Sequence, residues 1–183
     1  MTKPKIVVVY KSVTGFTREY AEKIAQKTGA SLLPLKSATA RSLSDFDTVI
    51  FGGRMHAGTL DGLKQAKALF AQSNASRLLL FATGACPNEA QDTIAEMWRN
   101  NLTPAELAEI PHFYMQGGLR YEKMPLGDRL MMKMFSSVMN RKKDKTDAER
   151  QMAAMIGKSF DISSDLYMTP LLKALEGAPL SQP

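Results

Sequence analysis

The chain of 183 residues contains one cysteine, Cys86, and only two histidines, His56 and His112. One cysteine excludes an internal disulfide, and two isolated histidines do not form a cluster of metal ligands. No apolar run approaches the length of a membrane span, and the N-terminus has no long apolar segment of the kind found in signal peptides. We therefore expect a cytoplasmic protein without a metal site.

Several functional motifs are also missing. The sequence has neither Gly-x-x-x-x-Gly-Lys-Ser/Thr nor Gly-x-Gly-x-x-Gly, the two common phosphate-binding loops. It has no Gly-x-Ser-x-Gly elbow or other hydrolase signature. Hydrolysis is therefore not indicated.

The composition is ordinary for a globular protein, with 44% hydrophobic residues, 23% charged residues and a formal net charge of +6. The length suits one well-buried domain, which we assign to residues 1–176, followed by a tail at 177–183. Because the basic residues are spread along the chain and not gathered in blocks, we do not expect nucleic acid as a partner.

A hydroxyl-rich stretch, Tyr-Lys-Ser-Val-Thr-Gly-Phe-Thr at residues 10–17, lies between an apolar run and a helical pattern. A turn from a strand into a helix presents free backbone N–H groups at the positive end of the helix dipole, which favours a bound phosphate. Ser12, Thr14 and Thr17 add hydroxyl groups, and Gly15 can take a positive φ angle. The alternative is an ordinary turn in which Thr14 or Thr17 only caps the helix.

Short apolar runs alternate with helical patterns along the chain. The apolar runs occur at 6–9, 31–35, 47–51, 77–82 and 112–116, and the helical patterns at 18–28, 60–71, 88–101 with Asn88 as N-cap, and 103–109. This alternation through short loops predicts an α/β doubly wound parallel sheet. Pro34 predicts that the second strand lies at an edge, because proline cannot donate a hydrogen bond to a neighbouring strand.

The last third of the chain begins with a helical pattern at 126–140 that has one broad apolar face. The residues of this face are Leu126, Leu130, Met131, Met134, Phe135 and Val138. We interpret the helix as the last one that packs on the sheet. The alternative is that 126–145, which ends in a basic stretch, contacts a membrane surface or a partner. Further helices are predicted at 147–158 and at 169–177.

At residues 12–17 the sequence resembles the flavodoxin family, whose Ser/Thr-x-Thr-Gly-x-Thr loop holds the phosphate of FMN. The resemblance implies a flavodoxin-like five-stranded parallel sheet of order 2-1-3-4-5 with helices on both faces. Residues 119–121 and the helix after them resemble the menaquinone-dependent protoporphyrinogen IX dehydrogenases, a membrane-associated branch of that superfamily. Residues 110–118 and 128–135 resemble uncharacterised flavodoxin-domain proteins more closely still. The dehydrogenase branch has a longer aromatic and basic stretch where this chain has residues 122–125.

The resemblance implies FMN as the cofactor, held by loops that meet where the strand order reverses. The expected cofactor-binding residues are Ser12, Val13, Thr14, Gly15, Phe16, Thr17, Gly53, Arg54, Met55, His56, Ala57, Gly58, Thr83, Gly84, Ala85, Cys86 and Pro87. We expect the glycines at 52, 53 and 58 to give the backbone freedom near the flavin. Arg54 or His56 would stabilise the negative charge of reduced flavin. The alternative for His56 is a solvent-exposed loop residue, and Cys86 is interpreted as a wall and not as a nucleophile.

Three functions follow as hypotheses. The main one is an FMN-dependent oxidoreductase, similar to the protoporphyrinogen dehydrogenases, that takes electrons from a donor near Arg54, His56 and Tyr121. It would pass them to a quinone or a protein acceptor. The second is an electron carrier of the flavodoxin type without its own substrate, against which the net charge of +6 argues because such carriers are typically acidic. The third is a binding module that has lost FMN.

Overall fold

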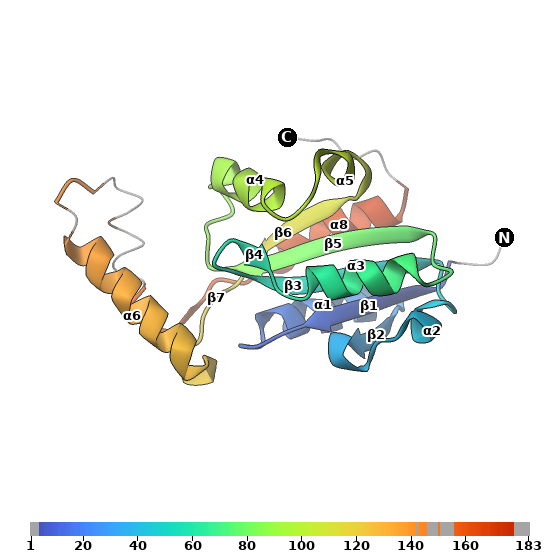
Figure 1. Ribbon diagram of the computed structural model, residues 1–183, viewed down its shortest axis with the longest axis horizontal. Coiled ribbons are helices and arrows are strands. Elements are labelled where there is room, and N and C mark those ends of the chain that lie inside the picture. Colours follow the sequence, from blue (N-terminus) through green and yellow to red (C-terminus); the bar gives the residue numbers. More distant parts are fainter. Residues whose placement is uncertain (1–3, 142, 146–149, 151–155, 178–183) are drawn as a thin grey trace.

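The computed structural model describes residues 4–141, 143–145, 150 and 156–177. Its centre is a parallel sheet in the order β2-β1-β3-β5-β6, with β4 paired antiparallel to β3 (Figure 1). The strands are β1 (Ile6–Lys11), β2 (Ser31–Pro34), β3 (Thr48–His56), β4 (Thr59–Leu60), β5 (Arg77–Gly84) and β6 (His112–Gln116). With the short β4 set aside, this is the predicted order 2-1-3-4-5, so the flavodoxin-like fold is confirmed.

Helices cover both faces of the sheet (Figure 1). One face carries α1 (Phe16–Thr28) and α8 (Thr169–Leu175), and the other carries α2 (Ala40–Leu43), α3 (Leu63–Ala71), α4 (Gln91–Arg99) and α5 (Pro104–Glu109). Single 3₁₀ turns lie at Leu35–Ser37, Tyr121–Lys123 and Asp165–Met168. The predicted helix at 169–177 is α8.

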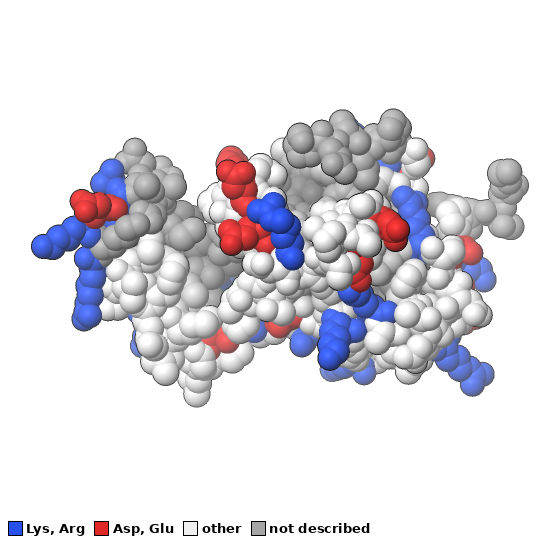
Figure 2. Space-filling model, turned by 45° about the horizontal axis from the view of Figure 1, so that its top comes forward, with Lys and Arg blue, Asp and Glu red and all other residues white. Residues whose placement is uncertain are grey.

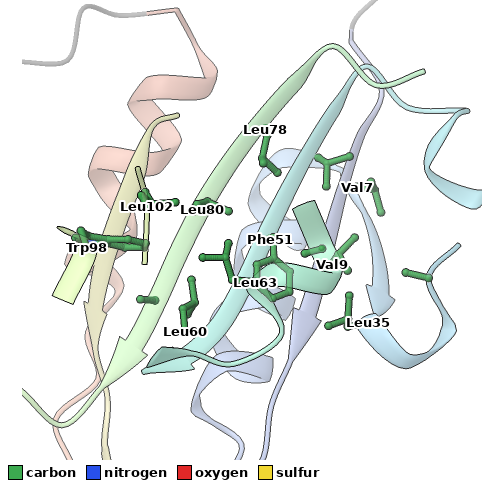
Figure 3. Packing of buried hydrophobic residues seen from close by; sticks show 14 of the residues in the cluster. Val7, Val9, Leu35, Phe51, Leu60, Leu63, Leu78, Leu80, Trp98 and Leu102 are labelled. Carbon is green, nitrogen blue, oxygen red and sulfur yellow. The ribbon is translucent and has the colours of Figure 1, made fainter. Parts of the chain in front are cut away.

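The two halves of the core follow from the two-residue period of a strand, which sends neighbouring side chains to opposite faces. On β1, Val7 and Val9 pack with Leu63 of α3, in the cluster drawn in Figure 3. Val8 points to the other face and packs with Ile24 of α1 and the residues around it. Because both faces are covered by helices, the central strands are apolar at almost every position.

Several local predictions are confirmed. β2 pairs only with β1 and forms an edge of the sheet, as Pro34 requires. α1 ends at Gly29, whose φ of 71° is the left-handed conformation of a C-terminal cap. The first turn of α5 carries a capping box in which Thr103 and Glu106 bind each other's backbone N–H groups.

The prediction that Asn88 caps a helix is wrong. α4 begins at Gln91, with Ala90 at the N-cap position. The backbone N–H of Asn88 instead donates to Oε1 of Gln116 at 3.1 Å, and its carbonyl accepts from Nε2 of Gln91 at 2.6 Å. These two bonds hold the segment before α4 in a turn against β6, so the helix starts two residues later than predicted.

The expectation that Gly52 and Gly53 give a loop its freedom is also wrong, because β3 runs through both to His56. Their function is close packing. A Cβ on Gly52 would overlap the ring of Phe81, and one on Gly53 would lie 2.6 Å from the backbone oxygen of Asp61. Only glycine lets β3 approach these neighbours so closely.

The helix predicted at 126–140 is present as α6 (Leu126–Arg141), but it does not pack on the sheet (Figure 1). A short ribbon of β7 (Gly118–Leu119) and β8 (Phe160–Asp161) leads the chain away before α6 begins. The interpretation as the last core helix is therefore wrong. Met168, Leu171 and Ala174, in and just before α8, fill that place in the core. The helix predicted at 147–158 and the tail predicted at 177–183 lie mostly outside the described residues.

The apolar face of α6 is open to solvent. Along its outer edge Leu126 is 81% exposed, Leu130 62%, Met134 64% and Val138 67%, whereas Met139 is buried. Over the whole molecule, Lys and Arg side chains are spread across the face drawn in Figure 2 and are not gathered in one band. No helix of the described residues is long and apolar enough to cross a membrane.

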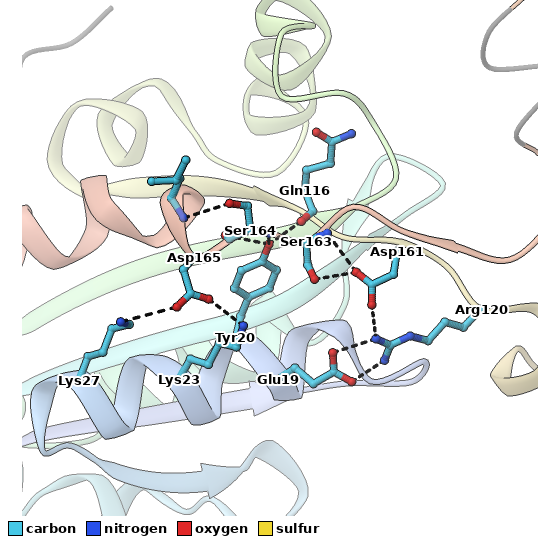
Figure 4. A network of polar contacts seen from close by, with 11 residues as sticks. Glu19, Tyr20, Lys23, Lys27, Gln116, Arg120, Asp161, Ser163, Ser164 and Asp165 are labelled. Carbon is cyan, nitrogen blue, oxygen red and sulfur yellow. Dashed lines mark hydrogen bonds and ion pairs between the residues drawn. The ribbon is translucent and has the colours of Figure 1, made fainter.

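A polar network links α1 to both ends of the segment between β7 and β8, which contains α6 (Figure 4). The Arg120 guanidinium donates to Glu19 at 2.5 and 2.8 Å and to Asp161 at 2.7 Å, and it lies 3.9 Å from the centre of the Phe16 ring. The hydrogen bond from Arg120 holds the pKa of Glu19 below its usual value. Because Arg120 follows β7 and Asp161 ends β8, one guanidinium fixes the position where the chain leaves the domain and the position where it returns.

The β3 packing makes a first prediction. Gly52→Ala forces a methyl group into the Phe81 ring, so it should lower the free energy of unfolding by about 2 kcal/mol. Urea denaturation followed by circular dichroism measures the loss. Gly127→Ala is the control, because a Cβ at that position in α6 meets nothing within 4 Å. Equal stability of the Gly52 variant and the wild type would contradict the packing argument.

Candidate functional site

The parallel register places the predicted site segments at one edge of the sheet. Lys11 lies beside Gly53 in the pairing of β1 with β3, and Arg54 lies beside Thr83 in the pairing of β3 with β5. The loop after β1, the end of β3 and the end of β5 therefore meet, although they are up to about 70 residues apart in sequence. This confirms that the three stretches share one crevice.

We call the crevice between these segments the apolar cleft, and its volume is about 210 Å³. From the predicted stretches it is lined by Thr14, Phe16, Arg54, Met55, His56, Ala57, Thr83, Gly84 and Ala85. From the C-terminal third it is lined by Gly118, Leu119, Met124, Asp128, Met131 and Met132. Its walls are mostly apolar, with a few polar groups that converge on it, which is typical of a small-molecule site.

Some predicted site residues lie outside this lining. Gly53 packs inside the sheet, and Gly58 sits with Ala57 in the two-residue turn between β3 and β4. Both turn residues have positive φ angles, 49° for Ala57 and 81° for Gly58, as a type I′ hairpin requires. Pro87 and Tyr121 also do not line the cleft. The Tyr121 hydroxyl donates to the backbone oxygen of Ile156.

Cys86 has the environment of a structural residue. Its side chain packs against the core cluster under α4 and does not line the apolar cleft. Burial raises the pKa of its thiol, so the reactive thiolate is disfavoured. Its backbone oxygen accepts a hydrogen bond from the Tyr114 hydroxyl at 2.9 Å. These contacts agree with the expectation that Cys86 is not a nucleophile, but its side chain does not form a wall of the apolar cleft as expected.

The loop at residues 12–17 ends in an uncapped helix. Gly15 is the N-cap of α1, with a φ of 108° and no side-chain hydrogen bond to the first turn. Thr17 is already inside the helix, and its Oγ1 lies 2.7 Å from Oγ1 of Thr83 in a buried contact. The alternative in which Thr14 or Thr17 only caps the helix is therefore wrong. The first N–H groups of α1 remain available for an anion.

Two buried polar atoms stand out in the described part of the chain because they have no hydrogen-bond partner. They are Oγ of Ser12, in the loop after β1, and Nε2 of His56, at the end of β3. Buried polar groups in native proteins are nearly always hydrogen-bonded, so each exception calls for a ligand or another explanation. Both atoms belong to segments that the sequence assigns to one site.

The polar wall of the apolar cleft is an ion-pair cluster. Nε of Arg54 lies 2.7 Å from Oδ2 of Asp61, and a terminal nitrogen of the same guanidinium lies 2.6 Å from Oδ2 of Asp128. Nε2 of His56 is 3.3 Å from Oδ1 of Asp128, which is ion-pair distance without hydrogen-bond geometry. The hydrogen bond from Arg54 is the main reason that the pKa of Asp128 is low. The charge of Arg54 is thus offset by two carboxylates.

The sequence analysis missed the contribution of α6 to the cleft. Asp128 is 74 residues from Arg54 in the chain, and no local pattern joins them. One signal was present, since Asp128, Met131 and Met132 are three and four residues apart and share one side of a helix. This side faces the cleft, while Leu126, Leu130 and Met134 lie on the exposed side.

Comparison with known proteins gives a family match over most of the chain. The family described as "Flavodoxin domain" matches residues 7–149. A search of curated proteins found no match.

Solved structures that resemble the chain do so at low identity. They include a candidate flavoprotein from Bacteroides eggerthii, with 16% identity, a TM-score of 0.43 and coverage of 61% of this chain and 86% of that one. An archaeal flavodoxin has 16% identity, a TM-score of 0.40 and coverage of 84% and 93%. A flavodoxin, WrbA-like protein from Agrobacterium tumefaciens has 17% identity, a TM-score of 0.40 and coverage of 84% and 96%. None of these three is described as a protoporphyrinogen dehydrogenase.

The ion pair between Asp128 and Arg54 predicts how α6 responds to pH. Because the pKa of Asp128 is lowered in the folded state, the pair stabilises α6 against β3 above the ordinary pKa of an aspartate. This stability is lost as the pH falls below about 4. Asp128→Asn removes the charge and should weaken the contact between α6 and β3 by about 1 kcal/mol. At pH 7 this corresponds to amide exchange in residues 126–134 that is about fivefold faster than in the wild type.

Hydrogen exchange read by mass spectrometry checks this, with Asp92→Asn on α4 as the control. An exchange rate in α6 that is the same in the Asp128 variant and the wild type would show that the ion pair does not hold the helix.

Proposed function

The chain belongs to the flavodoxin domain family, and from this premise we propose that it binds FMN and acts as an FMN-dependent oxidoreductase. The observation that carries the proposal is the pair of unpartnered buried atoms, Ser12 Oγ and His56 Nε2. Ser12 lines a second cleft beside the uncapped start of α1, His56 lines the apolar cleft, and the two clefts meet at Thr14. FMN has an anionic phosphate for the first and a flat ring with a hydrogen-bonding edge for the second.

Each part of the site has a separate task in this proposal. Ser12, Thr14 and the free N–H groups at the start of α1 hold the phosphate. Met55 and Ala57 from one side and Met131 from α6 enclose the ring and keep water from it. When bound, FMN supplies the redox chemistry, and the protein supplies binding, orientation and electrostatics.

The charges around Arg54 shape what this site can stabilise. Arg54 is shared between Asp61 and Asp128, so its positive charge is largely neutralised before any ligand binds. His56 makes no hydrogen bond through Nε2 and lies 3.3 Å from one carboxylate, Asp128, whereas Arg54 is bonded to two. Of the two candidates for stabilising reduced flavin, we therefore favour His56.

A quinone or a protein remains the proposed electron acceptor. The C-terminal third supplies apolar side chains, Leu119, Met124 and Met132, to the mouth of the cleft. Such a wall suits a small apolar ring. It also partly covers the site against docking of a second protein, which supports an enzyme over a carrier of the flavodoxin type. The net charge of +6 supports the same choice.

The phosphate contact is tested by comparing two flavins. Ser12→Ala removes one hydrogen bond to a charged group, worth about 2 kcal/mol, so it should weaken FMN binding by about 30-fold. Riboflavin, which lacks the phosphate, should bind the variant and the wild type equally well. Quenching of flavin fluorescence measures both dissociation constants.

Ser31→Ala is the matched control, because Ser31 is an exposed serine at the start of β2 and lies outside both clefts. A protein that binds neither flavin would overturn the proposed function. Equal loss of FMN and riboflavin in the Ser12 variant would instead show that Ser12 does not contact the phosphate.

We further propose that residues 126–145 make a peripheral contact with an anionic membrane surface. The exposed edge of α6 is apolar, and Arg129 and Lys133 lie on the same helix. Figure 2 shows Lys and Arg side chains, with an acidic side chain beside them, at the end of the molecule that α6 forms. The sequence there contains Arg141, Lys143 and Lys145, with Asp144 between the two lysines. An apolar edge with basic flanks is typical of helices that lie in the headgroup region. This contact would bring the cleft close to a lipid-soluble quinone.

Vesicle binding tests the membrane contact. Met134→Asp places a carboxylate on the exposed edge and removes an apolar side chain, so binding to vesicles with anionic lipid should fall at least about tenfold. Sedimentation with vesicles measures it. Leu166→Asp is the control, because Leu166 is 76% exposed on the 3₁₀ turn before α8, outside α6. Binding that both variants retain, or lose equally, would exclude α6 as the contact.

A further inference from the structure

A second cleft lies between the phosphate loop, which lines it with Ser12, Val13, Thr14 and Gly15, and the end of β2, and we call it the basic cleft. Its volume is about 640 Å³, and it shares Thr14 with the apolar cleft. Its cations come from four separate elements: Lys11 ends β1, Arg18 lies in α1, and Lys36 and Lys123 lie in two 3₁₀ turns. No Asp or Glu is among its lining residues.

The cations of the basic cleft are mostly unpaired. Lys11, Lys36 and Lys123 make no ion pair within 4.0 Å and no side-chain hydrogen bond with any described residue, while Arg18 lies 3.5 Å from Glu22. Two carboxylates interact with Lys123 at longer range: Glu19, which is already bound by Arg120, and the neighbouring Glu122. Grouped cations without counter-charges repel one another, so an anion in the cleft would relieve a cost that the fold carries without it.

The phosphate of FMN does not account for this charge. A phosphate monoester carries about two negative charges at neutral pH. In the proposed function, the loop N–H groups and Ser12 already form hydrogen bonds with this phosphate. Four cations around a cleft of about 640 Å³ exceed the needs of one monoester, in charge and in space. Val13, Pro34 and Leu35 add an apolar wall beside them. The cleft thus combines cations that can bind a pyrophosphate with an apolar wall that can contact the base of the same nucleotide.

We propose that the basic cleft is a second ligand site, which binds a nucleotide through its pyrophosphate while FMN occupies its own site. Lys11, Lys36 and Lys123 contact the pyrophosphate, and the apolar wall contacts the nucleoside. The inference rests on the proposed function in one respect, because it assigns the phosphate loop itself to FMN. Because the two clefts meet at Thr14, a nucleotide bound here lies next to the flavin site.

Calorimetric titration of the FMN-saturated protein with ADP and with inorganic pyrophosphate tests the site. Both should bind, ADP more tightly than pyrophosphate because it also uses the apolar wall, and both should weaken as salt is raised. Lys36→Glu and Lys123→Glu should each weaken binding about fivefold. Lys173→Glu on α8 changes the net charge equally at a remote exposed position and should leave binding unchanged.

The outcomes separate this inference from the proposed function. Loss of ADP binding when FMN saturates the protein would show that the cleft serves the FMN phosphate, and it would overturn a second site. If Lys173→Glu weakened binding as much as the cleft variants do, the effect would come from overall charge, and a second site would be overturned. The absence of any ADP or pyrophosphate binding would overturn it as well. The same titration of flavin-free protein tests the cleft even if FMN does not bind. Pyrophosphate that binds as tightly as ADP would overturn the nucleoside contact.

Discussion

The parallel register of β1, β3 and β5 is the constraint on which the rest of this structure depends. It places the carboxyl ends of three strands at one edge and so joins segments that the chain keeps far apart. The register in turn requires close contact between strands and side chains that only small residues permit, as at Gly52 against Phe81. The site is therefore built on the ends of closely packed central strands, which suits a bound cofactor that must be held in one orientation.

A second constraint comes from the network around Arg120. Glu19 and Asp161 hold its guanidinium between α1 and the β7-β8 ribbon, and α6 extends from that anchor. The same anchor places Asp128 against Arg54, so α6 has one side in the apolar cleft and one side in solvent. The segment that contains α6 thus provides one wall of the apolar cleft and the exposed apolar edge on which the proposed membrane contact rests. The two clefts meet at Thr14, in the loop that follows β1.

How far the sequence predicts this protein depends on the range of the interaction concerned. The turn and cap signals at Gly29, Thr103 and Pro34 act within a few residues, and the structure follows them. The helix start at Asn88 was misjudged because a contact from distant Gln116 overrides the local preference for a cap. The stripe on α6 predicts a helix correctly, but an apolar face looks the same in a sequence whether a core or solvent covers it.

The sequence by itself determined the alternation of strands and helices, the parallel sheet and the loop at residues 12–17 that leads from β1 into α1, because each depends on local periodicity or on a contiguous motif. Only the tertiary structure decided that Asp61 and Asp128 neutralise Arg54 and that Ser12 and His56 hold unpartnered buried atoms. It alone decided that four cations from separate elements share one cleft. These features depend on side chains brought together from distant parts of the chain, and such distances are set by packing.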